Sequence, residues 1–150
     1  MSESTYDLER FLKAQEMMYP WALREIRNGK KKSHWMWFVF PQLKALGRSH
    51  TALYYGLEGI GEAGAYLAHP VLGARLRQIT DALLSQEKRD PLVVMGYPDN
   101  LKLCSCMTLF AETTEENDCF LAVIEEFFGG QRDGLTLELL AAEKNRKNEN

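Results

Sequence analysis

The most informative part of this chain is the stretch Lys30-Lys31-Lys32-Ser33-His34-Trp35-Met36-Trp37-Phe38-Val39-Phe40-Pro41-Gln42. Three lysines, a serine and a histidine lead into an almost unbroken run of aromatic and aliphatic side chains. Because such a run does not alternate at a helix or strand period, we expect most of it to be buried, with its charged end toward solvent. The pattern fits a plug of the core and also an anion-binding pocket with aromatic walls.

The run has two structural interpretations. Ser33 can cap a short helix over residues 34–40 that Pro41 ends, whereas Trp, Phe and Val also favour a buried strand. We prefer the helix because the chain offers no clear partner strand. The one other strand-like run, residues 92–95, follows Asp90-Pro91, which equally suits a cap and a first helical position.

Outside this stretch, apolar residues recur at spacings of three and four. The pattern predicts an all-α fold, a single compact domain of about seven to nine short helices. The domain is expected to cover residues 1–150, with an ordered core over about 7–142 and a polar C-terminal tail. Besides residues 34–40, the expected helices cover residues 8–18, 21–27, 51–57, 62–68, 71–86, 101–112, 119–128 and 135–145.

The composition is that of a water-soluble globular protein, with 45% hydrophobic and 26% charged residues. No apolar run is long enough to cross a bilayer, and the first residues are polar and acidic, unlike a signal peptide. We therefore expect a cytoplasmic protein that does not bind membranes. The three cysteines, an odd number without the spacing of a metal site, are expected to be reduced and structural: Cys104, Cys106 and Cys119.

Charge is distributed unevenly along the chain. The net charge is −3, which makes nucleic acid an unlikely partner. Residues 1–50 carry nine Lys and Arg against five Asp and Glu, whereas residues 101–150 carry five against ten. The asymmetry favours either a homodimer contact between the two halves or a local anion site near Arg24, Arg27 and Lys30–Lys32, and a short basic cluster is also typical of a solvated helix end.

Candidate ligand-binding residues lie first in the Trp-rich stretch. Indole rings stack on nucleobases and cations, an imidazole exchanges hydrogen bonds with a ligand, and an amide can contact a base or ribose edge. The alternative is that both tryptophans fill the core and that the histidine only begins a helix. The candidates here are Lys32, Ser33, His34, Trp35, Trp37 and Gln42.

A second group of candidates suits acid–base chemistry. Glu62 and Tyr66 are four residues apart and His69 lies three further on, so the three side chains share one helix face. A carboxylate, a phenol and an imidazole in a row can transfer protons. We expect Glu62, His34 and Tyr66 to be catalytic and His69 to bind ligand. The alternative is an exposed Glu62, a packed Tyr66 and a His69 that only precedes proline.

A third group suits phosphate binding. Lys102, Ser105 and Thr108 follow a three-residue spacing near the start of a predicted helix, and Arg75 adds a further cation. A polar helix face is the alternative. The chain lacks the glycine-rich, P-loop, metalloprotease and nucleophile-elbow motifs, so no metal and no cofactor is predicted.

Several segments together resemble a bacterial family catalogued as domain of unknown function 1810, across residues 7–140. The resemblance implies a mainly α-helical fold and no established activity. Met95 departs from the pattern, which favours a larger aromatic residue there. The segments are Asp7-Leu8-x-Arg10-Phe11-x-x-Ala14-Gln15, residues 32–42, Glu62-Ala63-x-Ala65-Tyr66-Leu67-x-His69-Pro70-x-Leu72-Gly73-x-Arg75-Leu76, Lys102-Leu103-x-Ser105-x-Met107-Thr108-Leu109-Phe110 and Gly129-x-x-x-Asp133-x-x-Thr136.

Two classes of function follow. The first is a small-molecule site for a phosphate-bearing, nucleotide-like ligand, where Glu62 would cleave or transfer an N-glycosidic bond of the ADP-ribose type. A fainter similarity to helical domains linked to ADP-ribose points the same way. The second is a non-catalytic module that binds a partner protein or a second copy. The sequence leaves open whether the chain is an enzyme.

Overall fold

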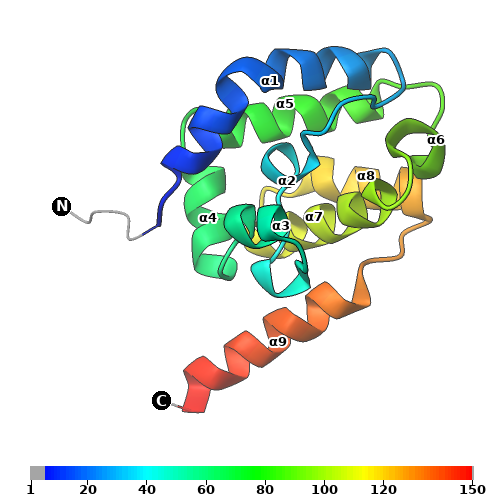
Figure 1. The fold of residues 1–150 in the computed structure, drawn as a ribbon. Helices are drawn as coiled ribbons and strands as arrows, with labels where there is room; N and C mark the ends of the chain where they lie inside the picture. The colour runs from blue at the N-terminus through cyan, green and yellow to red at the C-terminus, as the bar shows by residue number, and fades with distance from the viewer. Residues whose placement is uncertain (1–5, 150) are drawn as a thin grey trace.

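The described part of the chain, residues 6–149 of this computed structural model, consists of short helices joined by short loops (Figure 1). This part contains nine α-helices and a turn of 3-10 helix, and its one strand-like contact is a bridge between Leu43 and Leu57. The predicted all-α fold is therefore confirmed. The helices are α1 (Glu9–Arg27), α2 (Met36–Val39), η1 (Lys44–Leu46), α3 (His50–Tyr55), α4 (Ile60–Ala68), α5 (Leu72–Leu84), α6 (Pro91–Met95), α7 (Asp99–Thr113), α8 (Asp118–Phe128) and α9 (Gly134–Glu149).

Polar side chains begin two of the short helices. The Ser49 hydroxyl accepts a hydrogen bond from Ala52 N (3.1 Å) at the start of α3. The Asp90 carboxylate accepts one from Leu92 N (2.9 Å) at the start of α6. Residues 91–95 therefore form a helix and not a strand, because Asp90 caps it and Pro91 occupies the first turn, where a missing N–H costs nothing.

Helix α1 is longer than the sequence predicts. It continues through Pro20, where we expected one helix to end and another to begin. Pro20 is exposed, so the Glu16 carbonyl that loses its helical hydrogen bond can face water. Phe11 and Ile26, one on each side of Pro20, are fully buried, and their packing holds the two halves in one helix.

The Trp-rich stretch forms the predicted short helix with different boundaries. Helix α2 covers Met36–Val39, and Trp35 stands at its N-cap position in place of Ser33. Ser33 lies three residues before the first residue of α2, too far to cap it, and its hydroxyl instead donates a hydrogen bond to Glu25, on α1.

Helix α7 lies at the centre of the core. Its residues Leu103, Cys106, Met107 and Phe110 are fully buried. Helix α7 packs on α4, α6, α8 and α9, and α5 packs in turn on α1, α4 and α8 (Figure 1). Residues 105–111 are buried without a break, so the middle of α7 is covered on all sides by the other helices.

The C-terminal helix is also longer than expected. Helix α9 runs to Glu149, past Asn145, where the sequence pattern ends it. Its Glu143 side chain accepts a hydrogen bond from Ile60 N (3.1 Å) and so ties α9 to the start of α4. Residues 1–5 and 150, which include part of the polar N-terminus and the end of the predicted tail, lie outside the described residues. Among the described helices, none has the length and apolar character needed to span a bilayer.

Helices α4 and α5 meet so closely that only glycine fits at position 73. A Cβ atom on Gly73 would collide with the Leu67 carbonyl. We therefore expect Gly73→Ala to lower the free energy of unfolding by about 2 kcal/mol or more, measured by urea denaturation.

Gly64→Ala is the matched control in α4. Its Cβ would meet only Thr113 Cγ2 at 3.9 Å, so alanine should stabilise the helix by up to about 1 kcal/mol. Equal unfolding midpoints for Gly73→Ala and the natural sequence would contradict this account.

Candidate functional site

The Glu25 carboxylate holds the loop between α1 and α2. It accepts hydrogen bonds from Lys32 N (2.8 Å), from Ser33 N (2.9 Å) and from the Ser33 hydroxyl (2.6 Å). The Trp35 indole N–H donates to the same carboxylate at 2.9 Å. Four donors thus fix residues 28–35, which we call the Glu25 loop, and occupy the polar atoms of two predicted ligand-binding residues, Ser33 and Trp35.

The hydrogen bonds change the titration of Glu25. Burial would raise the pKa of the carboxyl group, but the donors on Ser33, Lys32 and Trp35 stabilise the ionised form and lower the pKa from 4.5 to about 2. A pKa that is lower in the folded than in the unfolded chain adds stability above the unfolded value. This contribution is lost as the pH falls from about 4.5 toward 2.

We expect Glu25→Gln to unfold more easily at neutral pH than the natural protein. Its free energy of unfolding should also decline less between about pH 4.5 and pH 2, because the variant lacks the carboxylate that must be protonated. Urea denaturation across this range measures both effects. Glu16→Gln, at an exposed position of the same helix, is the control and should follow the natural protein. Parallel pH curves for Glu25→Gln and the natural protein would refute the assignment.

Two lysine ammonium groups cover the two indole rings of the Trp-rich stretch. Lys31 Nζ lies 4.8 Å from the centre of the Trp35 ring, and Lys102 Nζ lies 5.0 Å from that of Trp37. The Asp99 carboxylate sits between the lysines, 2.8 Å from Lys31 Nζ and 3.7 Å from Lys102 Nζ. Cations from two segments far apart in the sequence thus lie over the two indole rings.

The two indoles nevertheless have different environments. Trp35 is fully buried and belongs to the core. Trp37 is partly exposed, and its Nε1 atom is buried without an acceptor among the described residues. A buried donor that makes no hydrogen bond is costly, so core packing alone does not account for Trp37.

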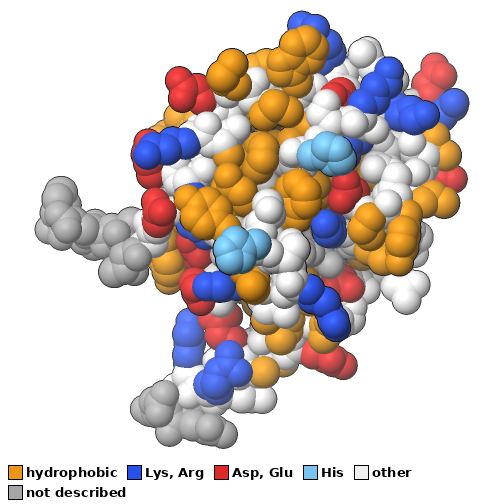
Figure 2. Space-filling view, in the orientation of Figure 1, with side chains coloured by type: hydrophobic (Ala, Val, Ile, Leu, Met, Phe, Trp, Pro, Cys, Tyr) orange, Lys and Arg blue, Asp and Glu red, His pale blue; other side chains and the backbone are white. Residues whose placement is uncertain are grey.

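Trp37 lines an open pocket of about 770 Å³, which we call the aromatic pocket. Figure 2 shows hydrophobic side chains and two histidines gathered on this face, over α2 and α3. The pocket falls within the roughly 300–1,000 Å³ typical of small-molecule sites. Its lining residues are His34, Trp37, Phe38, Lys44, His50, Thr51, Leu53, Tyr54 and Tyr55.

Aromatic contacts build the walls of the pocket. The ring centres of Phe38 and Tyr55 are 5.3 Å apart, and those of Tyr54 and Tyr55 are 4.8 Å apart, edge to face. Tyr54 is 57% exposed, so one of its faces is free to meet a ligand. Polar groups at the pocket include the imidazoles of His34 and His50 and the Lys44 ammonium. The arrangement can therefore stack a planar ring and place hydrogen bonds beside it.

Our sequence analysis missed several residues of this pocket, among them Lys44, His50 and Tyr54. One signal was available, because His50 and Tyr54 are four residues apart behind the Ser49 cap and so share a helix face. Lys44 carried no such signal. It reaches the pocket through the 3-10 turn η1, and its ammonium is also 3.2 Å from Glu58 Oε1.

The structure places Glu62 in the interior, away from the lining of the aromatic pocket. Its side chain is 2% exposed, and Oε2 lies 3.0 Å from the Arg10 guanidinium. Oε1 accepts a hydrogen bond from Glu58 N (2.8 Å). Arg10 also donates to the carbonyls of Tyr54 (2.8 Å) and Gly56 (3.1 Å). The pair therefore joins α1 to α4 and to the end of α3.

Tyr66 shares a helix with Glu62 but takes part in a separate buried network. Its hydroxyl accepts a hydrogen bond from Gln15 Nε2 (3.0 Å), which also donates to the Phe38 carbonyl (2.7 Å). The Arg75 guanidinium donates to Gln15 Oε1 (3.3 Å). Full burial raises the pKa of Tyr66 far above its ordinary value, so the phenol stays neutral. None of the hydrogen bonds among the described residues joins Tyr66 to Glu62.

His69 lies at the C-terminal end of α4, just before α5. Its Nδ1 atom accepts hydrogen bonds from Val71 N (3.1 Å) and Leu72 N (3.3 Å). The imidazole thus satisfies first-turn donors of α5 in the way that a cap residue does. The predicted row of Glu62, Tyr66 and His69 does lie along α4 and its end, but each side chain already has partners within the chain.

Two of the α7 residues predicted to bind phosphate, Ser105 and Thr108, instead contact Asp133 of the chain itself. The Ser105 hydroxyl donates to Asp133 Oδ2 (3.1 Å), and Thr108 Oγ1 accepts from Asp133 N (2.9 Å). Asp133 Oδ2 also accepts from Thr136 N (3.1 Å) at the start of α9. Ser105 and Thr108 therefore position α9, whereas Lys102 turns to Asp99 and Trp37.

The remaining predicted residues lie near the site but outside its lining. Lys32 is exposed on the Glu25 loop, and Gln42 follows α2, where its carbonyl accepts from Leu57 N (2.9 Å). The cysteines are free thiols, and burial raises the pKa of Cys106 well above its ordinary value. Within residues 6–149, no group of three or more His, Cys, Asp or Glu side chains is arranged to hold a metal ion.

The fold and the pocket define a small helical protein with one aromatic surface site. The chain belongs to the family described as "Protein of unknown function (DUF1810)", whose model matches residues 5–140. It is also similar to the conserved hypothetical protein Rv1873 from Mycobacterium tuberculosis, a crystal structure at 1.38 Å. The two are 46% identical with a TM-score of 0.90, over 92% of this chain and 99% of that one. None of the curated proteins compared with the chain matches it.

Removing the Glu62 carboxylate should destabilise the protein because it leaves the buried Arg10 guanidinium without its counter-ion. We expect Glu62→Gln to lower the free energy of unfolding by about 3 kcal/mol. Glu58→Gln, which removes the exposed partner of Lys44, should cost less than about 1 kcal/mol. Denaturant midpoints of the two variants make the comparison. A Glu62→Gln protein as stable as Glu58→Gln would show that the buried pair has no structural role.

Proposed function

We propose that this protein binds a planar, phosphate-bearing small molecule of the nucleotide type in the aromatic pocket. The observation that carries the proposal is the position of Trp37. Its ring lines the pocket and is covered by the Lys102 ammonium 5.0 Å away. Indole and phenol faces stack on bases, and a cation beside the ring adds attraction for an anionic ligand.

Other lining residues can contact the polar part of such a ligand. His34, His50 and Lys44 carry nitrogen donors at the pocket that suit phosphate and ribose oxygens. Tyr54 offers a second exposed ring for stacking. The ring of the ligand would therefore lie against Trp37 and Tyr54, with its polar end toward the imidazoles.

The sequence left open a second possibility, cleavage or transfer at an N-glycoside of the ADP-ribose type. In that hypothesis the Glu62 carboxylate would have to lie beside the bound ribose. Glu62 is absent from the pocket lining, and both its oxygens have partners. We therefore propose binding as the function of the pocket. Turnover can be followed in the same samples by measuring the released base by chromatography. If Glu62 acts on the glycosidic bond, Glu62→Gln should release no base.

The test is a binding titration with AMP, NAD and ADP-ribose, followed by thermal shift and by tryptophan fluorescence. Ligand at about 100 times its dissociation constant should stabilise the fold by roughly 2.7 kcal/mol. The double variant His34→Ala/Tyr54→Ala changes only exposed side chains and should weaken binding by about tenfold or more. Ribose 5-phosphate, which has no base, should bind far more weakly than AMP.

Trp21→Phe is the matched control. Trp21 is 53% exposed on α1, outside the aromatic pocket, so its loss should leave the affinity unchanged. In that variant, the fluorescence change on ligand binding comes from the remaining indoles, of which Trp37 borders the pocket. The proposal is wrong if no nucleotide shifts the melting temperature, or if Trp21→Phe and His34→Ala/Tyr54→Ala lose affinity equally.

A further inference from the structure

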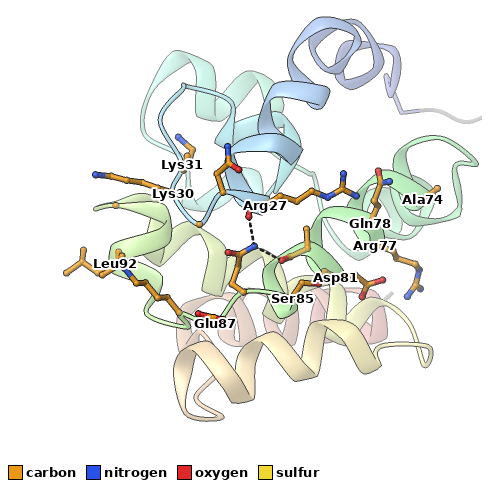
Figure 3. A pocket seen from close by; sticks show the side chains of 17 residues that line it. Arg27, Lys30, Lys31, Ala74, Arg77, Gln78, Asp81, Ser85, Glu87 and Leu92 are labelled. Carbon is orange, nitrogen blue, oxygen red and sulfur yellow. Dashed lines mark hydrogen bonds between the residues drawn. The ribbon is translucent and has the colours of Figure 1, made fainter.

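A second hollow lies away from the aromatic pocket, between the end of α1, the outer side of α5 and helix α6 (Figure 3). We call it the α1/α5/α6 groove. Its volume is about 1450 Å³, larger than the roughly 1,000 Å³ that a small-molecule site usually reaches. The Gln86 amide forms part of its wall and donates to the carbonyls of Arg27 and Ala82, both at 3.2 Å. This amide therefore links the end of α1 to the end of α5 beside the groove.

Positive charge dominates the groove. Its lining includes five Lys and Arg side chains against two carboxylates, those of Asp81 and Glu87. Lys31 is paired with Asp99, and the Arg77 guanidinium donates to the Glu116 carbonyl (2.9 Å). The other three cations lack a carboxylate within ion-pair distance among the described residues: Arg27, Lys30 and Lys88.

Apolar side chains stand next to these cations. Leu92 and Val93, on α6, are 54% and 46% exposed and line the same groove. Figure 3 shows Lys30 and Leu92 on the same side of the groove, with Arg27 and Gln78 farther along it. Exposed aliphatic residues beside unpaired cations match a ligand that carries both carboxylates and apolar side chains.

The lining also argues against nucleic acid. It contains no aromatic side chain on which a base could stack. Amides such as Asn28 and Gln78 can instead hydrogen-bond a peptide backbone. We propose that the α1/α5/α6 groove docks an acidic peptide segment of a partner protein, with its carboxylates on Arg27, Lys30 and Lys88 and an aliphatic side chain against Leu92 and Val93.

This inference does not depend on the proposed function. The groove and the aromatic pocket share no lining residue. The Glu25 loop passes between them, since Lys30 lines the groove and His34 lines the pocket. Variants of one site can therefore be tested for effects on the other.

The experiment measures fluorescence anisotropy of the full chain with a labelled peptide of glutamate in which every third residue is leucine. The natural protein should bind this peptide, more weakly as salt is raised, and should not bind the same peptide with lysine for glutamate. The triple variant Arg27→Ala/Lys30→Ala/Lys88→Ala should lose about tenfold or more in affinity. The charge-matched control Lys13→Ala/Arg48→Ala/Lys144→Ala changes exposed residues elsewhere and should bind like the natural protein.

Leu92→Ser/Val93→Ser separates docking from simple ion attraction. It should weaken binding of the leucine-containing peptide but not of a version with serine for leucine. Equal losses in the two triple variants would overturn the proposal, as would tighter binding of a uridine oligonucleotide at the same three cations. Sedimentation velocity tests a further alternative. If the natural protein is a dimer that does not bind the peptide, and the variant Arg27→Ala/Lys30→Ala/Lys88→Ala is a monomer, the groove binds a second copy of the chain and the proposal is overturned. If the natural protein binds the peptide but no nucleotide, that result would contradict only the function proposed for the aromatic pocket.

Discussion

A single carboxylate, that of Glu25, determines how the most unusual part of this chain is placed. It accepts hydrogen bonds from two backbone amides, one hydroxyl and one indole, all within residues 32–35. These bonds offset the conformational entropy that a loop with three consecutive lysines loses when it takes up one conformation. With the loop fixed, Trp35 enters the core, Lys31 reaches Asp99, and the chain is directed into α2 with Trp37 at the surface. Both proposed sites depend on this arrangement.

Polar residues that looked catalytic in the sequence mostly serve the interior. Glu62 neutralises Arg10, Tyr66 completes a network with Gln15, and Asp133 receives the hydroxyl of Ser105. A buried polar group needs a partner, and a tightly packed helical domain finds that partner in distant parts of its own chain. Residue types that suit acid–base or phosphate chemistry are the same types that suit this structural task. Sequence spacing alone therefore cannot distinguish the two roles.

The two surface sites differ in chemistry because different parts of the fold form them. Aromatic residues of α2 and α3 pack on one another and leave their outer faces as the walls of the aromatic pocket. The α1/α5/α6 groove instead lies where helices end, and helix C-termini favour cations such as Arg27. An aromatic wall suits a planar ring, whereas a charged groove suits an extended anionic chain.

The all-α fold and the positions of most helices could be predicted from the sequence, because these follow from local spacing and backbone chemistry. The sequence also named Trp37 and His34 as candidate ligand-binding residues, and both line the aromatic pocket. Packing between distant segments set three features that the pattern did not show: α1 continues through Pro20, Trp35 is buried while Trp37 is not, and His50 and Tyr54 line the same pocket. These outcomes depend on contacts between residues distant in the chain, since burial and pairing are properties of the packed molecule and no local pattern records them.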